Sequence, residues 1–135
     1  MGRRATREIA MKLLYQIEIR KDNIGEQITS IVEENDFNDK DKEYLIDVVN
    51  GVIKNKNQID ERIEKYLKGW KLNRISKVDL AIMRLSIYEQ IFRKDIPLSV
   101  SINEAVELAK KYSTEDSGSF INGVLSKLMQ SENLI

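Results

Sequence analysis

The first twelve residues carry four cations and a single acid: Arg3, Arg4, Arg7 and Lys12, with Glu8 between them. An arginine fork can hold a phosphate group through two parallel hydrogen bonds, so this cluster could bind the backbone of a nucleic acid. Arg3 and Arg7 are four residues apart and should project to one side of a helix. Cations at a helix start face the positive end of the helix dipole, and an anionic partner would relieve that repulsion. A solvated terminus with Arg4–Glu8 and Glu8–Lys12 pairs is the alternative that the residues leave equally open.

A second candidate lies where Asp116 and Phe120 flank the start of the last predicted helix. An aromatic ring at a helix start can stack on an unpaired base of single-stranded RNA, which contributes about 1–3 kcal/mol. The alternative is structural, with Phe120 in the core and the Asp116 carboxylate stabilised by the helix dipole. The residues by themselves favour the structural interpretation as the simpler one.

Other kinds of chemistry are excluded by residue type. The 135 residues include no cysteine and no histidine, which rules out disulfides, thiolate or imidazole metal sites and imidazole-based triads. The acidic run D-F-N-D-K-D-K-E, residues 36–43, lacks the glycine and the spacing of a calcium loop. We therefore predict no metal, no cofactor and no enzymatic activity.

The composition, 41% hydrophobic and 33% charged, is that of an ordinary globular protein, and residues 1–135 are predicted to form one domain. The formal net charge is zero, so any binding of nucleic acid must come from local asymmetry. RNA should avoid the segment from Glu33 to Asp47, which has seven acids against two lysines. No apolar run approaches the roughly 20 residues that cross a bilayer, and no signal peptide is evident, which predicts a cytoplasmic protein without membrane contact.

Apolar residues recur at helical spacing along nearly the whole chain, strand-like alternation is absent, and the only proline is Pro97. We predict an all-α protein of about seven helices, with a helix start near Asn38 or Asp39. Residues 76–93 are apolar on more than one face and should form the most buried helix. Ser101 and Glu104 have the spacing of a capping box and predict a helix start at Ser101. Gly123, within the last apolar stripe, is expected to admit a close backbone contact.

Several segments, in this order, resemble the NusB family of bacterial antitermination factors, and together they cover nearly the whole chain. They are R-R-A-x-R-E at 3–8, L-L-Y-Q-I-E at 13–18, I-S-K-V-D-L-A-I-M-R-L-S-I-Y-E at 75–89, D-I-P at 95–97, I-N-E-A-V-E-L-A-K at 102–110 and D-S-x-x-F-I-N-G-V-L at 116–125. The resemblance implies two small three-helix subdomains that share a central helix.

The resemblance also implies a function. It suggests a non-enzymatic adaptor that joins the ribosomal protein NusE, binds single-stranded boxA RNA and keeps the elongation complex, with other Nus factors, antiterminating on ribosomal RNA operons. Matching positions that contact the RNA or lie near it are Arg3, Arg4, Arg7, Tyr66, Asp116 and Phe120. Tyr15 and Asp79 would border the surface that takes up NusE. Tyr88, Glu89, Asn103 and Asn122 are expected to serve as scaffold.

One alternative is the accessory NusB-like domain of an RNA cytosine methyltransferase. The catalytic part of such an enzyme needs a glycine-rich nucleotide-binding unit and a cysteine nucleophile, and this sequence has no cysteine. A purely structural helical protein is the remaining alternative. The oligomeric state, including a homodimer, and the bases that are read stay open at this point.

Overall fold

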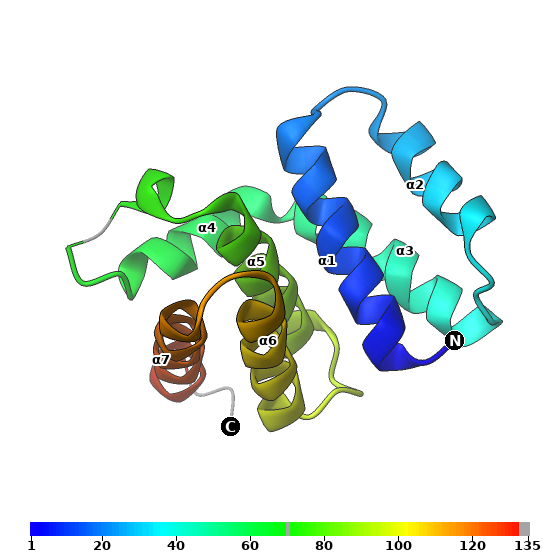
Figure 1. The fold of residues 1–135 in the computed structure, drawn as a ribbon. Coiled ribbons are helices and arrows are strands. Elements are labelled where there is room, and N and C mark those ends of the chain that lie inside the picture. The colour runs from blue at the N-terminus through cyan, green and yellow to red at the C-terminus, as the bar shows by residue number, and fades with distance from the viewer. Residues whose placement is uncertain (70, 133–135) are drawn as a thin grey trace.

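The computed structural model describes residues 1–69 and 71–132 of the chain, and in this part every regular element is a helix (Figure 1). The elements are α1 (Arg3–Ile19), α2 (Ile24–Glu34), α3 (Asp39–Lys54), α4 (Lys56–Lys65), the single 3₁₀ turn η1 (Leu72–Arg74), α5 (Lys77–Phe92), α6 (Leu98–Tyr112) and α7 (Glu115–Ser131). The prediction of an all-α protein with about seven helices is confirmed.

Helix α5 lies at the centre and contacts α1 and α3 on one side and α4, α6 and α7 on the other. Figure 1 shows α1, α2 and α3 grouped together, with α4, α6 and α7 across α5 from them. Twelve of the sixteen α5 residues are buried, and the Leu85 side chain is among them. The arrangement confirms two three-helix subdomains around a shared central helix, as a helix that is apolar on several faces requires.

Three helices begin at residues whose side chains accept a hydrogen bond from the backbone N–H three positions later. These N-caps are Asn38, Ser76 and Thr114. Each satisfies one of the amides that a helix start leaves without a partner. The predicted start near Asn38 is confirmed.

The predicted helix start at Ser101 is wrong. Helix α6 begins three residues earlier, at Leu98, with Pro97 as its N-cap. The Ser101 hydroxyl is buried between helices, where it donates to Glu89 Oε1 at 2.7 Å and lies 2.9 Å from the Ser86 hydroxyl. Ser101 therefore links α6 to α5 and does not cap its own helix.

The expected close approach at Gly123 is also wrong, because a Cβ atom added there would meet nothing within 4 Å. The close approach occurs at Gly51 in α3, where an added Cβ would lie 2.1 Å from Cε1 of Tyr88. Gly123 is on the exposed face of α7, whereas Gly51 faces α5. Helical periodicity alone could not show which glycine has a neighbour.

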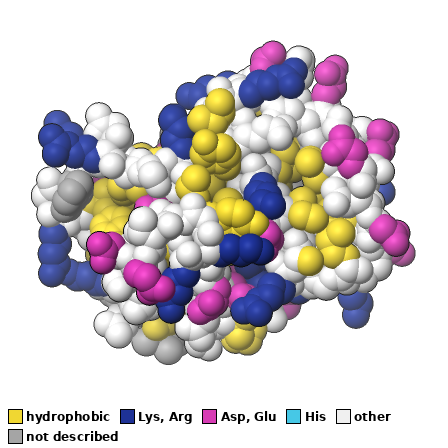
Figure 2. All heavy atoms as spheres, in the orientation of Figure 1, with side chains coloured by type: hydrophobic (Ala, Val, Ile, Leu, Met, Phe, Trp, Pro, Cys, Tyr) yellow, Lys and Arg dark blue, Asp and Glu magenta, His cyan; other side chains and the backbone are white. Residues whose placement is uncertain are grey.

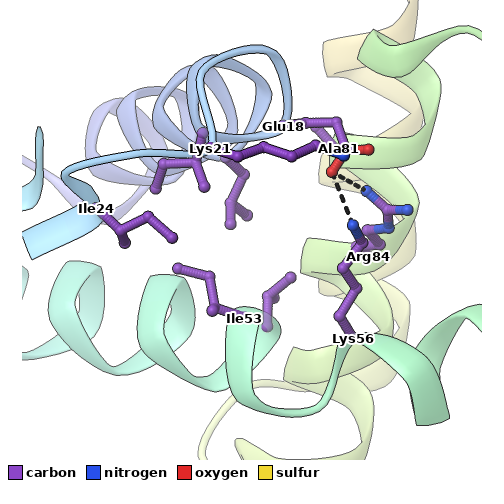
Figure 3. Close-up of a pocket in the computed structure, with 10 residues that line it drawn as sticks. Glu18, Lys21, Ile24, Ile53, Lys56, Ala81 and Arg84 are labelled. Carbon is purple, nitrogen blue, oxygen red and sulfur yellow. Dashed lines mark hydrogen bonds and ion pairs between the residues drawn. The ribbon is translucent and has the colours of Figure 1, made fainter.

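A charged network joins the two subdomains beside a small apolar cavity (Figure 3). The buried Arg84 of α5 donates to both carboxylate oxygens of Asp60 in α4, at 2.8 and 2.9 Å, and to Glu18 in α1 at 3.3 Å. Lys56 also donates to Glu18, at 3.0 Å.

Within residues 1–69 and 71–132, no helix has both the length and the apolar character needed to cross a bilayer.

Candidate nucleic-acid interface

The N-terminal arginines differ sharply in their surroundings. Arg3 and Arg7 both face the ring of Tyr44 in α3, with their guanidinium carbons 4.4 and 5.7 Å from its centroid. The prediction that Arg3 and Arg7 share one side of the helix is confirmed. This contact with Tyr44 is a tertiary feature that no local pattern in the sequence indicated.

Arg7 is buried, so the alternative of a solvated terminus is wrong for this residue. Its Nε donates to Glu89 Oε2 at 2.9 Å, and the Tyr44 hydroxyl donates to the same oxygen. Burial alone would lower the pKa of Arg7, but Tyr44 and Glu89 outweigh burial and raise it. Arg7 therefore serves as the buried partner of Glu89, because a buried carboxylate without a cation would destabilise the fold.

Arg4 is the exposed member of the cluster, with 74% of its side chain accessible. Its Nε lies 3.1 Å from Glu104 Oε2 in α6, so in the described part of the chain it pairs with Glu104 and not with Glu8. Glu104 also lies 3.6 Å from Arg7 Nη1. The expected Glu8–Lys12 pair does form, at 3.7 Å. Arg4 remains open to a phosphate group on its solvent side.

At the start of α7, a shallow hollow of about 310 Å³ brings together residues that are far apart in the sequence. Phe120 is half-buried, so its ring packs against the core and still lines this hollow. Asp116 and Arg74 of η1, both exposed, line the same hollow, so a cation is present there. An aromatic face next to a cation in an open hollow can accept an unpaired base and its phosphate.

Asp79, which the resemblance placed at the protein-partner surface, also lines this hollow. It is buried in the first turn of α5, and its Oδ2 accepts a hydrogen bond from the Ser117 hydroxyl at 3.0 Å. The structure therefore places Asp79 beside Asp116 and Phe120. Asp79 ties the start of α5 to the start of α7 and helps to shape the hollow.

The remaining two predicted residues lie elsewhere. Tyr66 is half-buried at the end of α4, and its hydroxyl donates to Glu132 at the end of α7, at 3.2 Å. Tyr15 lies on α1 with 38% of its surface exposed, and Ile19, one helical turn further along, is also exposed. Tyr15 and Ile19 thus place two apolar side chains in solvent on one side of α1.

The visible face carries charges of both signs. Figure 2 shows several Lys and Arg side chains over the region where α1 meets α6, with Asp and Glu side chains among them, and further Asp and Glu side chains along the outer edge near α2. The N-terminal half of this basic region is evident from the sequence, but no local pattern indicated its α6 half, Lys111 and Tyr112. Those residues are about a hundred positions from Arg4 and become neighbours only when α6 packs beside α1.

Comparison with known proteins gives a consistent result. The model of the NusB family matches residues 4–130. A transcription antitermination protein NusB from Acetivibrio thermocellus is 65% identical over 130 residues, covering 96% of this chain and 90% of that protein. A second transcription antitermination protein NusB, from Ruminiclostridium cellulolyticum, is 53% identical over 132 residues, covering 98% of this chain and 91% of that protein.

Comparison with solved structures points to the same family. NusB of T. maritima has a TM-score of 0.86 at 40% identity, covering 96% of this chain and 92% of its own. A chain in the crystal structure of antitermination factors NusB and NusE in complex with double-stranded RNA has a TM-score of 0.87 at 34% identity, and the match covers 96% of each chain.

Proposed function

Because this chain belongs to the NusB family, we propose that it binds boxA RNA together with NusE and promotes processive transcription of ribosomal RNA operons. In this role it would join the other Nus factors on the elongation complex in the cytoplasm, with residues 1–135 acting as one domain. The relative solved with NusE and RNA supports both kinds of partner.

The observation that carries the proposal is the hollow at the start of α7. Phe120 offers a half-exposed ring there, and Arg74 places a cation at the same opening. Stacking on a ring accepts any unpaired base, while the cation attracts the strand to which the base belongs. Asp116 lines the same hollow, and Tyr66, at the end of α4, is proposed as a further RNA contact outside it.

The three N-terminal arginines have different proposed roles in RNA binding. We propose that the exposed Arg4 contacts phosphate directly and that Arg3, half-buried against Tyr44, presents its remaining polar edge to the strand. The buried Arg7 acts indirectly, because it lies against Glu104, the carboxylate that holds Arg4. Tyr15, with the exposed Ile19 beside it, is proposed to meet NusE. Asp79 lines the hollow at the start of α7, so if it borders the NusE surface, NusE must reach that hollow as well.

Substitution of Phe120 by leucine tests the base-stacking role. Leucine keeps much of the apolar volume but lacks a π face, so the affinity for a boxA-like RNA should fall by about 1–3 kcal/mol. The free energy of unfolding should change by less than about 1.5 kcal/mol, as for a tolerated hydrophobic exchange. Filter-binding titrations with boxA-like and scrambled RNA, with and without NusE, would be combined with urea denaturation of the same preparation.

Phe37 provides a matched control, since it is also half-buried against the core but lies between α2 and α3. Phe37→Leu should leave RNA affinity unchanged. If Phe120→Leu lowers stability while the folded protein binds RNA normally, the ring is a packing residue and the proposed base site is refuted.

A further inference from the structure

Four side chains meet on the seam between α1 and the end of α6. Glu8 of α1 accepts hydrogen bonds from the Tyr112 hydroxyl and from Lys111 Nζ, the latter at 3.1 Å, and lies 3.7 Å from Lys12 Nζ. The ammonium groups of Lys12 and Lys111 lie 5.1 and 5.4 Å from the centroid of the Tyr112 ring. One carboxylate and one aromatic ring therefore hold two lysines together.

The cations are on the surface and the acid is beneath them. The side chains of Lys12 and Lys111 are 56% and 62% exposed, whereas that of Glu8 is 24% exposed. The hydrogen bond from Tyr112 lowers the pKa of Glu8 against the opposing effect of burial, and Lys111 lowers it further. Glu8 is thus ionised at neutral pH and cancels one of the two positive charges, so the pair keeps a surplus cation that faces solvent.

Fixing the two lysines in advance matters for binding. A lysine side chain has many rotamers, and part of this entropy is lost whenever the ammonium group is held by a ligand. Here contacts within the protein already restrict both side chains. A phosphate group would therefore meet two ammonium groups that are already close together.

The seam also connects the two parts of the proposed RNA surface. Arg4, Glu8 and Lys111 line one hollow of about 220 Å³ together with Glu104, so one lysine of the pair shares a hollow with the N-terminal arginine. The seam is also close to the helix that carries Phe120. Tyr112 is the last residue of α6, and α7 begins three residues later. Of the nearby acids, Glu104 is occupied by Arg4, and Glu107 is paired with Lys110 at 3.9 Å.

We infer that Lys12 and Lys111 form a phosphate-binding site for single-stranded RNA on the α1–α6 seam, with Glu8 and Tyr112 as positioning residues. The strand passes over this site on its way between Arg4 and the hollow at Phe120. The inference rests on the proposed function, because the ligand is the same RNA.

The test is the salt dependence of RNA binding by the double variant Lys12→Gln and Lys111→Gln. With roughly 0.7 per phosphate contact on a single strand, the slope of log K against log salt should be smaller by up to about 1.4 than that of the wild type. The pair Lys40→Gln and Lys42→Gln removes the same charge from the exposed start of α3 and should keep the wild-type slope. The double variant Lys12→Arg and Lys111→Arg keeps both charges and should preserve the slope.

The outcomes separate the inference from the proposed function. A wild-type slope in the Lys12/Lys111 double variant, in a protein whose affinity still falls on Phe120→Leu, overturns the seam site alone. Loss of NusE binding by that variant in the absence of RNA would make the seam a protein interface and would also overturn it. If the wild-type protein does not prefer boxA-like RNA over scrambled RNA, the proposed function fails, and this inference fails with it.

Discussion

Arg7 and Glu89 form a buried ion pair between α1 and the central helix, with Arg7 Nε 2.9 Å from Glu89 Oε2. The second oxygen of Glu89 accepts a hydrogen bond from Ser101 in α6, at 2.7 Å. With the Tyr44 hydroxyl on Oε2, this one carboxylate joins α1, α3, α5 and α6. An arginine from a basic terminus thus contributes to the fold, although its neighbours in sequence remain candidates for RNA contact.

Replacement of Arg7 by alanine should strongly destabilise the protein. The change leaves the Glu89 carboxylate buried without its cation, which typically costs about 3–5 kcal/mol. Arg4→Ala removes the same charge one turn away, but Arg4 is exposed, so that variant should unfold at nearly the wild-type urea concentration. Equal urea midpoints for the two variants would contradict the structural role of Arg7.

Replacement of Glu104 by glutamine should strengthen RNA binding. Glu104 neutralises Arg4 in the free protein, so a phosphate must displace it or share the arginine with it. An exposed ion pair is worth up to about 1 kcal/mol, which predicts a gain in affinity of up to about fivefold in an RNA titration at low salt. Glu107→Gln removes the same charge from α6 without releasing Arg4 and should give a smaller gain. Equal gains for both variants would mean that only net charge matters.

Gly51→Ala should destabilise the protein because the new methyl group would lie 2.1–2.5 Å from three atoms of the Tyr88 side chain. Forcing extra volume into a packed contact costs typically about 1–3 kcal/mol. Gly123→Ala, in an open helical position, should instead be neutral or stabilise by up to about 1 kcal/mol. Thermal unfolding of the two variants checks the prediction, and an unaffected Gly51→Ala protein would show that α3 and α5 separate easily.

Stability should fall between pH 10 and 12 partly through Tyr88. Burial, together with a hydrogen bond to Asp47 at 2.8 Å, raises the pKa of Tyr88 from 10.0 to about 12. Between pH 10 and 12 the folded state keeps the proton of the Tyr88 hydroxyl, whereas the unfolded state loses it. The contribution of Tyr88 is therefore fully present below pH 10 and is lost as pH rises toward 12.

The Tyr88→Phe variant isolates this effect, since its unfolding free energy should depend less steeply on pH in the same window. Urea denaturation at several alkaline pH values would measure both curves. Parallel curves would show that Tyr88 titrates alike in the folded and unfolded states.

The local sequence determined the helices and showed which helix is the most buried. Apolar residues at i, i+3 and i+4 mark the buried side of each helix, and their spread over several faces marks α5 as central, because burial follows hydrophobicity along a known helical period. The start of α3 at Asn38 was equally predictable, since an N-cap contact spans only three residues. The order of the NusB-like segments was enough to indicate the family.

Only the tertiary structure decided the partner of each charged or polar side chain. Arg4 and Arg7 look alike in sequence, but one lies against Glu104 in solvent and the other against Glu89 in the interior. Ser101 has the spacing of a cap and instead bonds to α5, and Lys111 meets Glu8 across about a hundred residues. Such pairs depend on where helices cross. Helical periodicity shows which face of a helix is buried, but it does not show which residue of another helix lies opposite.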